Sequence, residues 1–506
     1  MKQETDDPNL KGLGLVAIHI DHGFRSKSTQ DAQHCENWAK SRSIPLVTCK
    51  IPWGEPPFPK LKSLNEHKEE MARLARMQLL FWVMQEKKAS TILMAHHLDD
   101  QIETSVMRYR RLKDRTFASG ITPLGLAGMR PCRRWGMGLP PKSGLGFFGA
   151  EGMNHWISRP LLEVPKSRII QTAKDDGLIW VEDESNDDVH FTERNSIRAQ
   201  IRVAPESIWL LAPQLPPYSP FEDGNHLPLV DKVNRHIEVR DEVENEGEWP
   251  NSADVYLRKH TGFGPEGTFH LVTSKSTSPS GNVRLAVVSR ILRYVSPHPW
   301  GSPQAEAGRD RAKLRRIADA IWPYRDEAEE ETFWKANLAG TRRKFSGGGF
   351  VLWHPTPWTS VTKVLSQGYV ADTRGLDSII RYDEAFGWLA QRQPTHKFCP
   401  ATVDITEKLE SREPFSVLWD CRWLLEFSSN AIDVLQHSQQ FRAMARDAPE
   451  RRDRYFITAG DQFWRPCVSY QNARIHKGPV LQLAQSFGDL QVPAVTMRFV
   501  RTMERL

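Results

Sequence analysis

Cysteine is scarce in this sequence of 506 residues: there are six, and no two of them form a Cys-x-x-Cys pair. This spacing excludes the common zinc motifs and a dense disulfide framework, and it fits a reducing compartment. No apolar run reaches the roughly eighteen residues that span a bilayer, so no membrane-spanning helix is predicted. The basic excess is also small, 68 Lys and Arg against 62 Asp and Glu. Such a balance permits an anionic partner without demanding one.

Strand and helix patterns alternate in the first hundred residues. Short apolar runs are separated by segments whose apolar residues recur at helical spacing. The predicted elements are a strand at Leu13–Ile20, a helix at Asp31–Arg42, a strand at Ile44–Ile51, a helix at Leu64–Lys87 and a buried strand at Thr91–Ala95. This order predicts an α/β fold with a parallel sheet. Farther along, Pro165–Asp176 is predicted as a helix and Ile179–Val181 as a short strand.

The stretch Ser90–Met107 holds an unusual group of chemically versatile side chains. Four of them are spaced i, i+3, i+4 and i+7 and are predicted to share one face at the start of a helix: His96, Asp99, Asp100 and Glu103. Mg²⁺ takes one or two carboxylates together with phosphate oxygens, and an imidazole or a carboxylate can move a proton. The stretch is therefore a candidate site for a metal-assisted nucleotide reaction. The alternative is a solvated helix start whose acidic residues are favoured by the helix dipole.

Two further sets of charged side chains are spaced to share a helix face. The first lies on the long predicted helix and comprises Glu70, Arg73 and Arg76. The second is Arg194 and Arg198, whose i,i+4 spacing suits a phosphate or a carboxylate. For both sets, ion pairing on a solvated surface is the alternative.

Composition divides the chain into predicted domains. Residues 1–203 form the first domain, interrupted by an irregular insertion at about residues 112–156 that is rich in Gly and Pro. Residues 204–228 hold several Pro and are predicted as a linker. Residues 229–340 are predicted as a mainly helical basic region, and residues 341–506 as an α+β domain.

Two features of these later regions carry specific expectations. The predicted helices Leu285–Val295 and Arg309–Trp322 are amphipathic and basic, so their polar faces either meet nucleic-acid phosphates or face solvent. Ser346–Gly349 lies between two strand-like stretches and is predicted as a hairpin turn rather than as a phosphate-binding loop.

The order of the motifs resembles that of the tRNA(Ile)-lysidine synthases, an N-type ATP pyrophosphatase family with a PP-loop. The matching stretches lie over roughly residues 13–200 and are His19–Arg25, Glu70–Arg76, Ala95–Thr104, Gly125–Met129, Arg159–Leu162, and Asp183–Asp188 with Arg194–Arg198. The most specific is His-His-x-Asp-Asp-x-x-Glu-Thr, which begins at His96. The resemblance implies a parallel-sheet domain of the adenine nucleotide alpha hydrolase type, followed by a mixed α+β C-terminal region.

The family joins lysine to carbon 2 of the wobble cytidine in an isoleucine tRNA anticodon. ATP first adenylates the cytidine with loss of pyrophosphate, and the lysine ε-amine then displaces AMP. The implied partners are this tRNA, lysine and ATP, with Mg²⁺ as cofactor. The implied catalytic residues are His96, Asp99, Asp100 and Glu103, of which Asp99 and Asp100 would hold Mg²⁺. The implied nucleotide-binding residues are Asp21, His22 and Arg25, and the implied substrate and tRNA-binding residues are Glu70, Arg73, Arg76, Arg159, Asp183, Asn186, Arg194, Asn195 and Arg198.

One motif of the family is absent from this sequence. Its members begin with a strand that runs into Ser-Gly-Gly-x-Asp-Ser, whose backbone N–H groups hold the ATP pyrophosphate. No such string precedes the strand at Leu13, so the sequence predicts a domain that is incomplete at its N-terminus. Three explanations stay open: coding sequence upstream of Met1, a second polypeptide that supplies the loop as half of a split enzyme, or a catalytically inactive tRNA-binding remnant.

Two expectations concern location and the choice of enzyme within the superfamily. The mild basicity, the Pro- and Gly-rich insertion and the large C-terminal region are typical of a eukaryotic organellar member. A mitochondrial location is therefore expected, with the cytoplasm as the alternative, although the acidic stretch Met1–Pro8 is unlike a presequence. A tRNA thiolase of the same superfamily fits less well, because no Cys pair accompanies the motifs.

Overall fold

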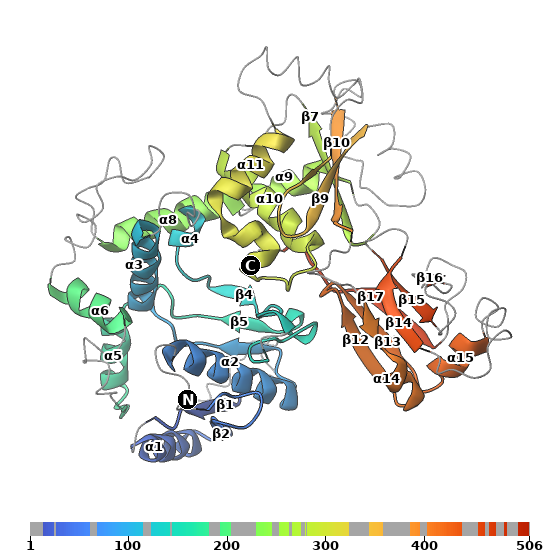
Figure 1. Ribbon diagram of the computed structural model, residues 1–506. Helices are drawn as coiled ribbons and strands as arrows, with labels where there is room; N and C mark the ends of the chain where they lie inside the picture. The colour runs from blue at the N-terminus through green and yellow to red at the C-terminus, as the bar shows by residue number, and fades with distance from the viewer. Residues whose placement is uncertain are drawn as a thin grey trace, which may run out of the picture. The chain divides into compact units, whose positions relative to one another are not determined.

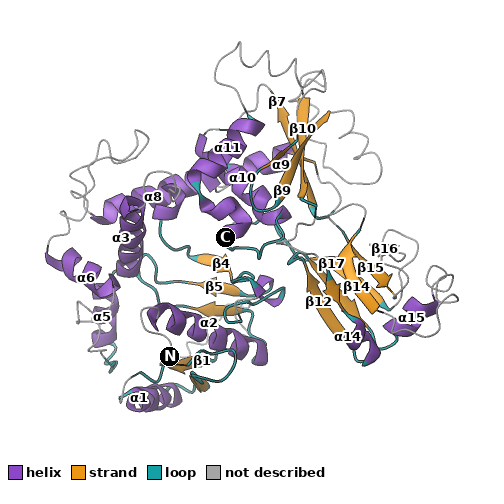
Figure 2. Cartoon of the chain, in the orientation of Figure 1, coloured by secondary structure: helices purple, strands orange, loops and turns teal. Residues whose placement is uncertain are grey.

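The chain divides into two compact units in the computed structural model. Unit 1 comprises residues 1–111 and 128–234, and unit 2 comprises residues 112–127 and 235–506. The structure describes residues 14–24, 27–60, 68–114, 123–141, 144–181, 193–203, 229–244, 252–262, 266–274, 279, 281–322, 344–357, 385–394, 402–437, 454–460, 465–471, 480–482 and 494–504. Figures 1 and 2 show the elements of both units.

The described residues of unit 1 form two small sheets. In the first, β1 (Ala17–Asp21) pairs in parallel with β2 (Leu46–Lys50), and α1 (Ser28–Ser41) connects them. In the second, β3 (Thr91–Leu93) pairs in parallel with β5 (Trp156–Ser158). These parallel pairs confirm the predicted α/β class. The strand β4 (Cys132–Arg134) pairs with β5 in antiparallel fashion. The segment predicted as an irregular insertion therefore supplies a strand to the sheet, and that prediction was wrong for residues 132–134.

The helix α2 (Lys68–Glu86) is buried on two faces. Ala75 and Leu79 pack into one apolar cluster with Ile51 and Phe58, and Leu80, Phe81 and Met84 pack into another with Trp135 and Ile157. A helix with apolar residues on more than one face lies inside a fold rather than on its surface. Here α2 links the core beside β2 with the core beside β5.

The other helices of unit 1 largely follow the sequence prediction. They are α3 (Leu98–Asp114), the 3₁₀ helix η5 (Glu151–Met153), α5 (Lys166–Asp175), α6 (Glu193–Val203) and the start of α8 (Leu229–Glu244). Pro165 precedes α5, and Gly177 ends it with a φ of 64°. The strand predicted at Ile179–Val181 was wrong: these residues pair with no described strand, and their side chains are exposed. The predicted linker 204–228 lies outside the described residues.

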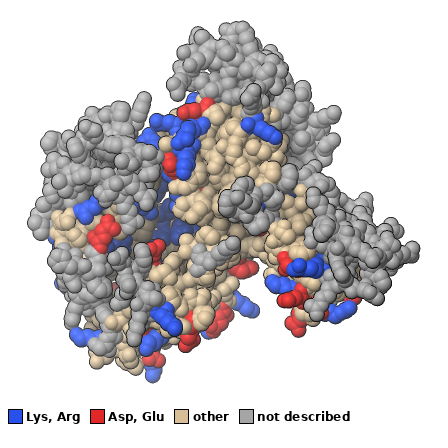
Figure 3. Space-filling view, viewed as in Figure 1, with Lys and Arg blue, Asp and Glu red and all other residues tan. Residues whose placement is uncertain are grey.

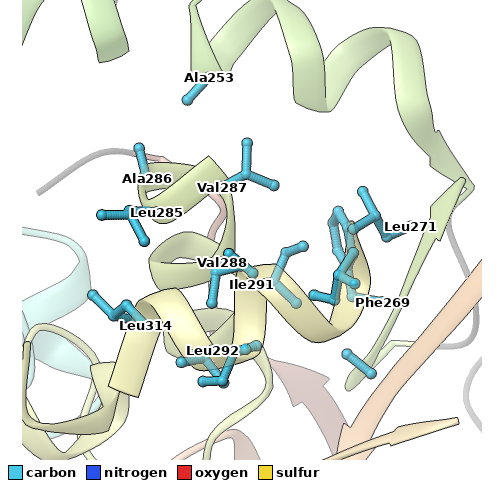
Figure 4. Packing of buried hydrophobic residues seen from close by; sticks show 14 of the residues in the cluster. Ala253, Phe269, Leu271, Leu285, Ala286, Val287, Val288, Ile291, Leu292 and Leu314 are labelled. Carbon is cyan, nitrogen blue, oxygen red and sulfur yellow. The ribbon is translucent and has the colours of Figure 1, made fainter. Parts of the chain in front are cut away.

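Unit 2 begins with helices around a five-stranded sheet. The helices are α4 (Pro123–Leu126), α8, α9 (Ala253–His260), α10 (Gly281–Val295), η8 (Pro303–Arg309) and α11 (Arg311–Ile321). The strands, in sheet order, are β6 (Thr261–Gly262), β7 (Thr268–Ser274), β10 (Ala385–Arg392), β9 (Val351–Pro357) and β8 (Phe345–Ser346). This sheet takes strands from both sides of the boundary predicted near residue 340. Figure 4 shows α10 at the centre of the core, with Val287, Val288 and Ile291 among the buried residues.

The arginines of α10 are structural. Arg290 is buried and pairs with Asp254, and Arg293 is buried with its Nε 3.2 Å from Glu306. Because both guanidinium groups already have a carboxylate partner inside unit 2, α10 presents neither of them to nucleic acid or to solvent. The expectation of a basic polar face was therefore wrong for this helix.

The glycine-rich stretch Ser346–Gly349 is a hairpin turn, as predicted. It joins β8 to β9, which pair in antiparallel fashion. A Cβ atom added at Gly349, where φ is 58°, would meet the carbonyl oxygen of Ala305 at 2.9 Å. The turn is thus packed against η8 and leaves no cradle for a phosphate.

The last part of unit 2 contains two further sheets. One comprises β11 (Val403–Asp404), β14 (Arg454–Ala459), β15 (Pro466–Gln471) and β16 (Val480–Gln482), and the other β12 (Phe415–Trp419), β13 (Trp423–Phe427) and β17 (Val495–Phe499). Short helices α14 (Thr406–Glu410) and α15 (Ala431–His437) accompany them. Trp419 and Trp423 are fully buried, so these tryptophans serve the core and not base stacking.

No helix in the described part of the chain is long and apolar enough to cross a membrane.

A buried histidine in β7 predicts acid sensitivity. Burial lowers the pKa of His270 to about 4. The unfolded chain, with a pKa near 6.5, binds the proton more tightly, so stability is lost as the pH falls from about 6.5 to 4, by about 3 kcal/mol for this group. His270→Leu should flatten the fall in melting temperature over that range, whereas His34→Leu should not. Identical pH dependence in the native protein and the His270 variant would contradict this prediction.

Candidate active site

The predicted site lies where β3 runs into α3. His96 and His97 form the link between the strand and the helix, so His96 precedes α3 instead of standing on it. The backbone N–H of His97 donates to Asp100 Oδ2 at 3.1 Å. Asp100 thus caps the first turn of its own helix, a position where a carboxylate satisfies an otherwise unpaired N–H.

Asp99 caps a second helix. Its Oδ2 accepts a hydrogen bond of 2.8 Å from the backbone N–H of Lys166, the first residue of α5. The residue before α5 is Pro165, which provides no side-chain cap of its own. Asp99 therefore supplies from α3 the acceptor that the start of α5 needs.

The imidazole of His97 lies between these two carboxylates. Its Nδ1 is 3.6 Å from Asp99 Oδ2, and its Nε2 is 3.5 Å from Asp100 Oδ2. The sequence contained His97 in its most specific motif, but the helical spacing selected His96 alone. The adjacent pair of histidines was the signal that could have drawn attention to both.

Glu103 is buried and engaged by two arginines of α6. Arg198 donates from Nε to Oε1 at 2.7 Å and from Nη2 to Oε2 at 3.2 Å, a two-pronged contact. Arg194 Nε lies 3.2 Å from Oε2 of the same carboxylate. The hydrogen bond with Glu103 raises the pKa of Arg198. Glu103 thereby fixes α6 against α3 and orients both arginines.

Arginines from three elements gather near His96. Burial lowers the pKa of Arg73, and the nearby guanidinium of Arg194 lowers it further. Burial also lowers the pKa of Arg76, and the guanidinium groups of Arg73 and Arg194 add to this effect. Burial and then Arg73 lower the pKa of Arg159, which follows β5. Arg73, Arg76 and Arg159 form no ion pair with a carboxylate among the described residues. We call Arg73, Arg76, Arg159 and Arg194 the arginine cluster; its mutual repulsion makes it a site for anions.

His96 is kept neutral by this environment. Burial lowers its pKa to about 4, which outweighs the opposing effect of Asp100, and Arg159, Arg194 and Arg73 act in the same direction as burial. The Nδ1 atom of His96 is buried and has no hydrogen-bond partner within the described residues. A neutral imidazole with an open nitrogen can accept a proton or a hydrogen bond from a substrate.

The structure describes two of the three residues that were predicted to bind the nucleotide, Asp21 and His22. Asp21, at the end of β1, is buried and accepts a hydrogen bond of 2.7 Å from the N–H of Gly23, whose φ is 67°. His22 lines a cavity of about 540 Å³ together with Arg76 and His96. The predicted residues Arg25, Asp183 and Asn186 lie outside the described residues.

Two other residues that the sequence predicted to bind tRNA differ from each other in their exposure to solvent. Glu70 is exposed on the first turn of α2, and Asn195 is buried on α6. The structure thus brings together His96, Asp100 and the arginine cluster, with Asp99 and Glu103 serving as a cap and an anchor for the neighbouring helices.

Asp99 and Asp100 fit a magnesium ion only in part. No group of three or more His, Cys, Asp or Glu side chains within the described residues could hold a metal by itself. Each of the two carboxylates has one oxygen engaged by a helix-capping N–H, and Oδ1 of Asp99 accepts no hydrogen bond within the same residues. Such a pair suits a Mg²⁺ that takes its other ligands from phosphate and water.

A comparison with protein families agrees with the fold of unit 1 and with these residues. Residues 1–205 match the model of the PP-loop domain family.

The particular resemblance is to tRNA(Ile)-lysidine synthases, as the motifs predicted. The chain is 30% identical to the tRNA(Ile)-lysidine synthase of Bacillus subtilis (strain 168) over 192 residues, which are 38% of this chain and 34% of that protein. It is 34% identical to the probable tRNA(Ile)-lysidine synthase of Schizosaccharomyces pombe over 185 residues, 36% of either protein. The match therefore spans about a third of the length of these relatives.

Among solved structures, the U34-tRNA thiolase NcsA from Methanococcus maripaludis with its [4Fe-4S] cluster has a TM-score of 0.28 and 14% sequence identity, covering 46% of this chain and 65% of its own. A likeness at this level carries no conclusion.

Proposed function

We propose that the protein modifies tRNA as an ATP-dependent lysidine ligase, joining lysine to the wobble cytidine of an isoleucine tRNA. The observation that carries this proposal is a neutral imidazole, that of His96, held beside the arginine cluster. Adenylation of the cytidine by ATP releases pyrophosphate, and attack of the lysine ε-amine on carbon 2 then releases AMP. One site must therefore hold phosphates and also receive a proton. The relatives that match this chain carry the same enzyme name.

The arginine cluster would bear the phosphate charge of this reaction. Positively charged donors that are already in place stabilise the charge that develops when the α-phosphate is attacked. The two-pronged contact with Glu103 orients Arg198. Arg194 places its Nε near Glu103, while its Nη1 and Nη2 face Asp100 and Thr104. Mg²⁺, when bound, would be held by Asp99 and Asp100 and would offset charge on the departing pyrophosphate.

His96 would take up the proton that lysine must lose. The ε-amine attacks in its uncharged form, and its nitrogen carries a positive charge once it is bonded to carbon 2, so that it is then acidic enough to give a proton to a weak base. Because its pKa is about 4, His96 is neutral throughout the physiological range and its Nδ1 is open. It would act as the proton acceptor beside the reacting carbon.

The second candidate function is tRNA binding without catalysis, or catalysis only together with another polypeptide. The observation that favours binding is the polar face of α11. Lys313, Arg315 and Arg316 are exposed there, while Leu314 and Ile317 point into the core. Figure 3 shows Lys and Arg side chains gathered over this helix. Unlike α10, α11 therefore retains the basic face that could contact phosphates.

The mitochondrial location stays a prediction.

The decisive assay measures release of AMP. The protein is incubated with α-labelled ATP, lysine and an isoleucine tRNA that has a wobble cytidine, and AMP formation should require all three. The matched control is the same tRNA with uridine at the wobble position, which should yield no AMP. Binding of the tRNA that weakens with salt, without any AMP release, would reject the ligase proposal for this chain and favour the second candidate.

A further inference from the structure

A buried glutamine on α3 holds the backbone of a residue that lies 28 positions farther along the chain. Gln101 is 1% exposed, and its side-chain amide makes two hydrogen bonds to Met129. Oε1 accepts from the Met129 N–H at 2.6 Å, and Nε2 donates to the Met129 carbonyl oxygen at 2.9 Å. One side chain thus pairs with both backbone groups of a residue, as a peptide unit does in a hydrogen-bonded pair of an antiparallel ladder.

A second residue of α3 holds the neighbouring peptide. Nη1 of Arg108 donates to the carbonyl oxygen of Gly128 at 2.7 Å. Gln101 and Arg108 are spaced i, i+7, so both side chains leave the same face of α3. We call these two side chains, together with the backbone of Gly128 and Met129, the α3 clasp.

The geometry of the α3 clasp requires its glycine. Gly128 has a φ of 69°, a left-handed conformation that favours glycine. A Cβ atom added there would also meet Cδ of Gln101 at 2.9 Å. The chain leaves unit 1 after Arg111 and returns to it at Gly128. The α3 clasp therefore fastens the chain at its point of return, and it uses the last two residues of the stretch Gly125–Met129.

The residues that follow the α3 clasp lead directly to the arginine cluster. The carbonyl oxygen of Arg130, the residue after Met129, accepts a hydrogen bond of 2.9 Å from Nη1 of Arg159. The next carbonyl oxygen, that of Pro131, accepts from the backbone N–H of Arg159 at 2.7 Å. Residues 130 and 131 therefore hold both the main chain and the guanidinium group of Arg159.

The orientation of Arg159 depends on this contact. The residue is 6% exposed, and the bond to Arg130 is the only hydrogen bond of its guanidinium group within the described residues. Its Nε is buried and has no hydrogen-bond partner there. A buried donor that is left open in this way suits a ligand with acceptor oxygens, such as a phosphate group. The position of the Arg130 carbonyl thus determines where the open donor points.

We propose that Gln101 is a positioning residue for the anion site: through the α3 clasp it holds the Arg130 carbonyl so that the guanidinium group of Arg159 is directed at a bound phosphate. Gln101 acts through Arg159 and does not touch the ligand. The inference deepens the proposed function and rests on it for the nature of the anion, because pyrophosphate is released in the first step. The helix α3 then serves the site twice, since its first turn also carries Asp99 and Asp100.

Calorimetry with inorganic pyrophosphate and Mg²⁺ tests this role on the full chain. Gln101→Met keeps the size of the side chain but removes both hydrogen bonds to Met129. It should weaken pyrophosphate binding by about fivefold or more, and Arg159→Met should weaken it by about tenfold or more. In the Arg159→Met background, the Gln101 change should alter the affinity by less than about twofold, because its effect acts through Arg159.

The matched control is another buried glutamine of unit 1. Oε1 of Gln78, on α2, accepts a hydrogen bond of 3.0 Å from the backbone N–H of Gly146. Gln78→Met removes this bond without touching the α3 clasp, so the affinity for pyrophosphate should stay native. Amide hydrogen exchange at residues 128–130 should quicken by about tenfold or more in Gln101→Met, with exchange at β5 unchanged. This pattern would show that the α3 clasp opens while the sheet stays intact.

Several results would overturn the proposal: native affinity in Gln101→Met, additive losses for Gln101→Met and Arg159→Met, equal losses for the two glutamine variants, or no binding of pyrophosphate by the native protein. If Gln101→Met does not fold, Gln101→Glu replaces it. The carboxylate keeps the acceptor for the Met129 N–H and loses the donor, and the same pattern is expected. Because calorimetry needs neither lysine nor tRNA, the role of Gln101 is decided separately from AMP release, and either can fail while the other stands.

Discussion

Replacement of His96 by alanine is expected to lower the rate of AMP release by about 100- to 10,000-fold, the usual contribution of a general base. The imidazole is neutral because burial lowers its pKa to about 4, and its buried Nδ1 has no partner within the described residues. His97 also has a buried Nδ1 without a hydrogen-bond partner within the described residues, but its ring lies between the carboxylates of Asp99 and Asp100. The loss should appear in kcat, with tRNA binding retained.

The pH profile distinguishes this role from a structural one. Since His96 is protonated only below about pH 4, it should contribute no acid limb to kcat between pH 5 and 8. His34→Ala, on α1, is the matched control and should keep the native rate. An acid limb near pH 6.5 that disappears in the His96 variant would show an ordinary, solvated histidine and contradict the environment described here. A variant with the native rate would remove His96 from the chemistry.

Replacement of Glu103 by alanine is expected to lower the free energy of unfolding of unit 1 by about 2–3 kcal/mol, because the change removes a buried carboxylate that two half-buried guanidinium groups engage. Arg198 contacts both oxygens of Glu103, and Arg194 lies 3.2 Å away from one of them. Urea denaturation followed by far-ultraviolet circular dichroism measures the change.

A double-mutant cycle separates this ion pair from simple loss of packing. Glu103→Ala combined with Arg198→Ala should destabilise the protein by less than the sum of the single changes. Arg315→Ala on the exposed face of α11 is the control for loss of an arginine and should leave the midpoint unchanged. Strict additivity of Glu103→Ala and Arg198→Ala would contradict the coupling.

The sequence predicted those elements whose signals are local. Helical periodicity and a capping Pro and Gly located α2 and α5, and the glycine-rich turn at Ser346–Gly349 was identified by its strand-like flanks. The strands β4 and β5 were not predicted, because three residues are too few to show a period. β7 was missed because it lies inside a region dominated by helical patterns.

The site was predicted in its membership better than in its roles. Spacing placed Glu103 on the same face as the carboxylates of the helix start, yet its partner Arg198 lies 95 residues farther along the chain. The capping of α5 by Asp99 likewise depends on a contact over 67 residues. Only the tertiary structure shows that the carboxylate of Glu103 anchors α6, whereas the carboxylate of Asp99 caps the start of α5. The apolar composition of β3 could not show whether a neighbouring strand covers it.

The arginine cluster has a consequence for turnover. With no anion present, the positive charges on α2, α6 and the segment after β5 repel one another. The electrostatic repulsion within the arginine cluster is therefore strongest in the ligand-free protein. Any polyanion that enters relieves this repulsion, and a released pyrophosphate does so as well as ATP. In the proposed reaction such a site would hold its products: departure of the anion would restore the repulsion, and escape of pyrophosphate or AMP would be the slow step, which salt would accelerate.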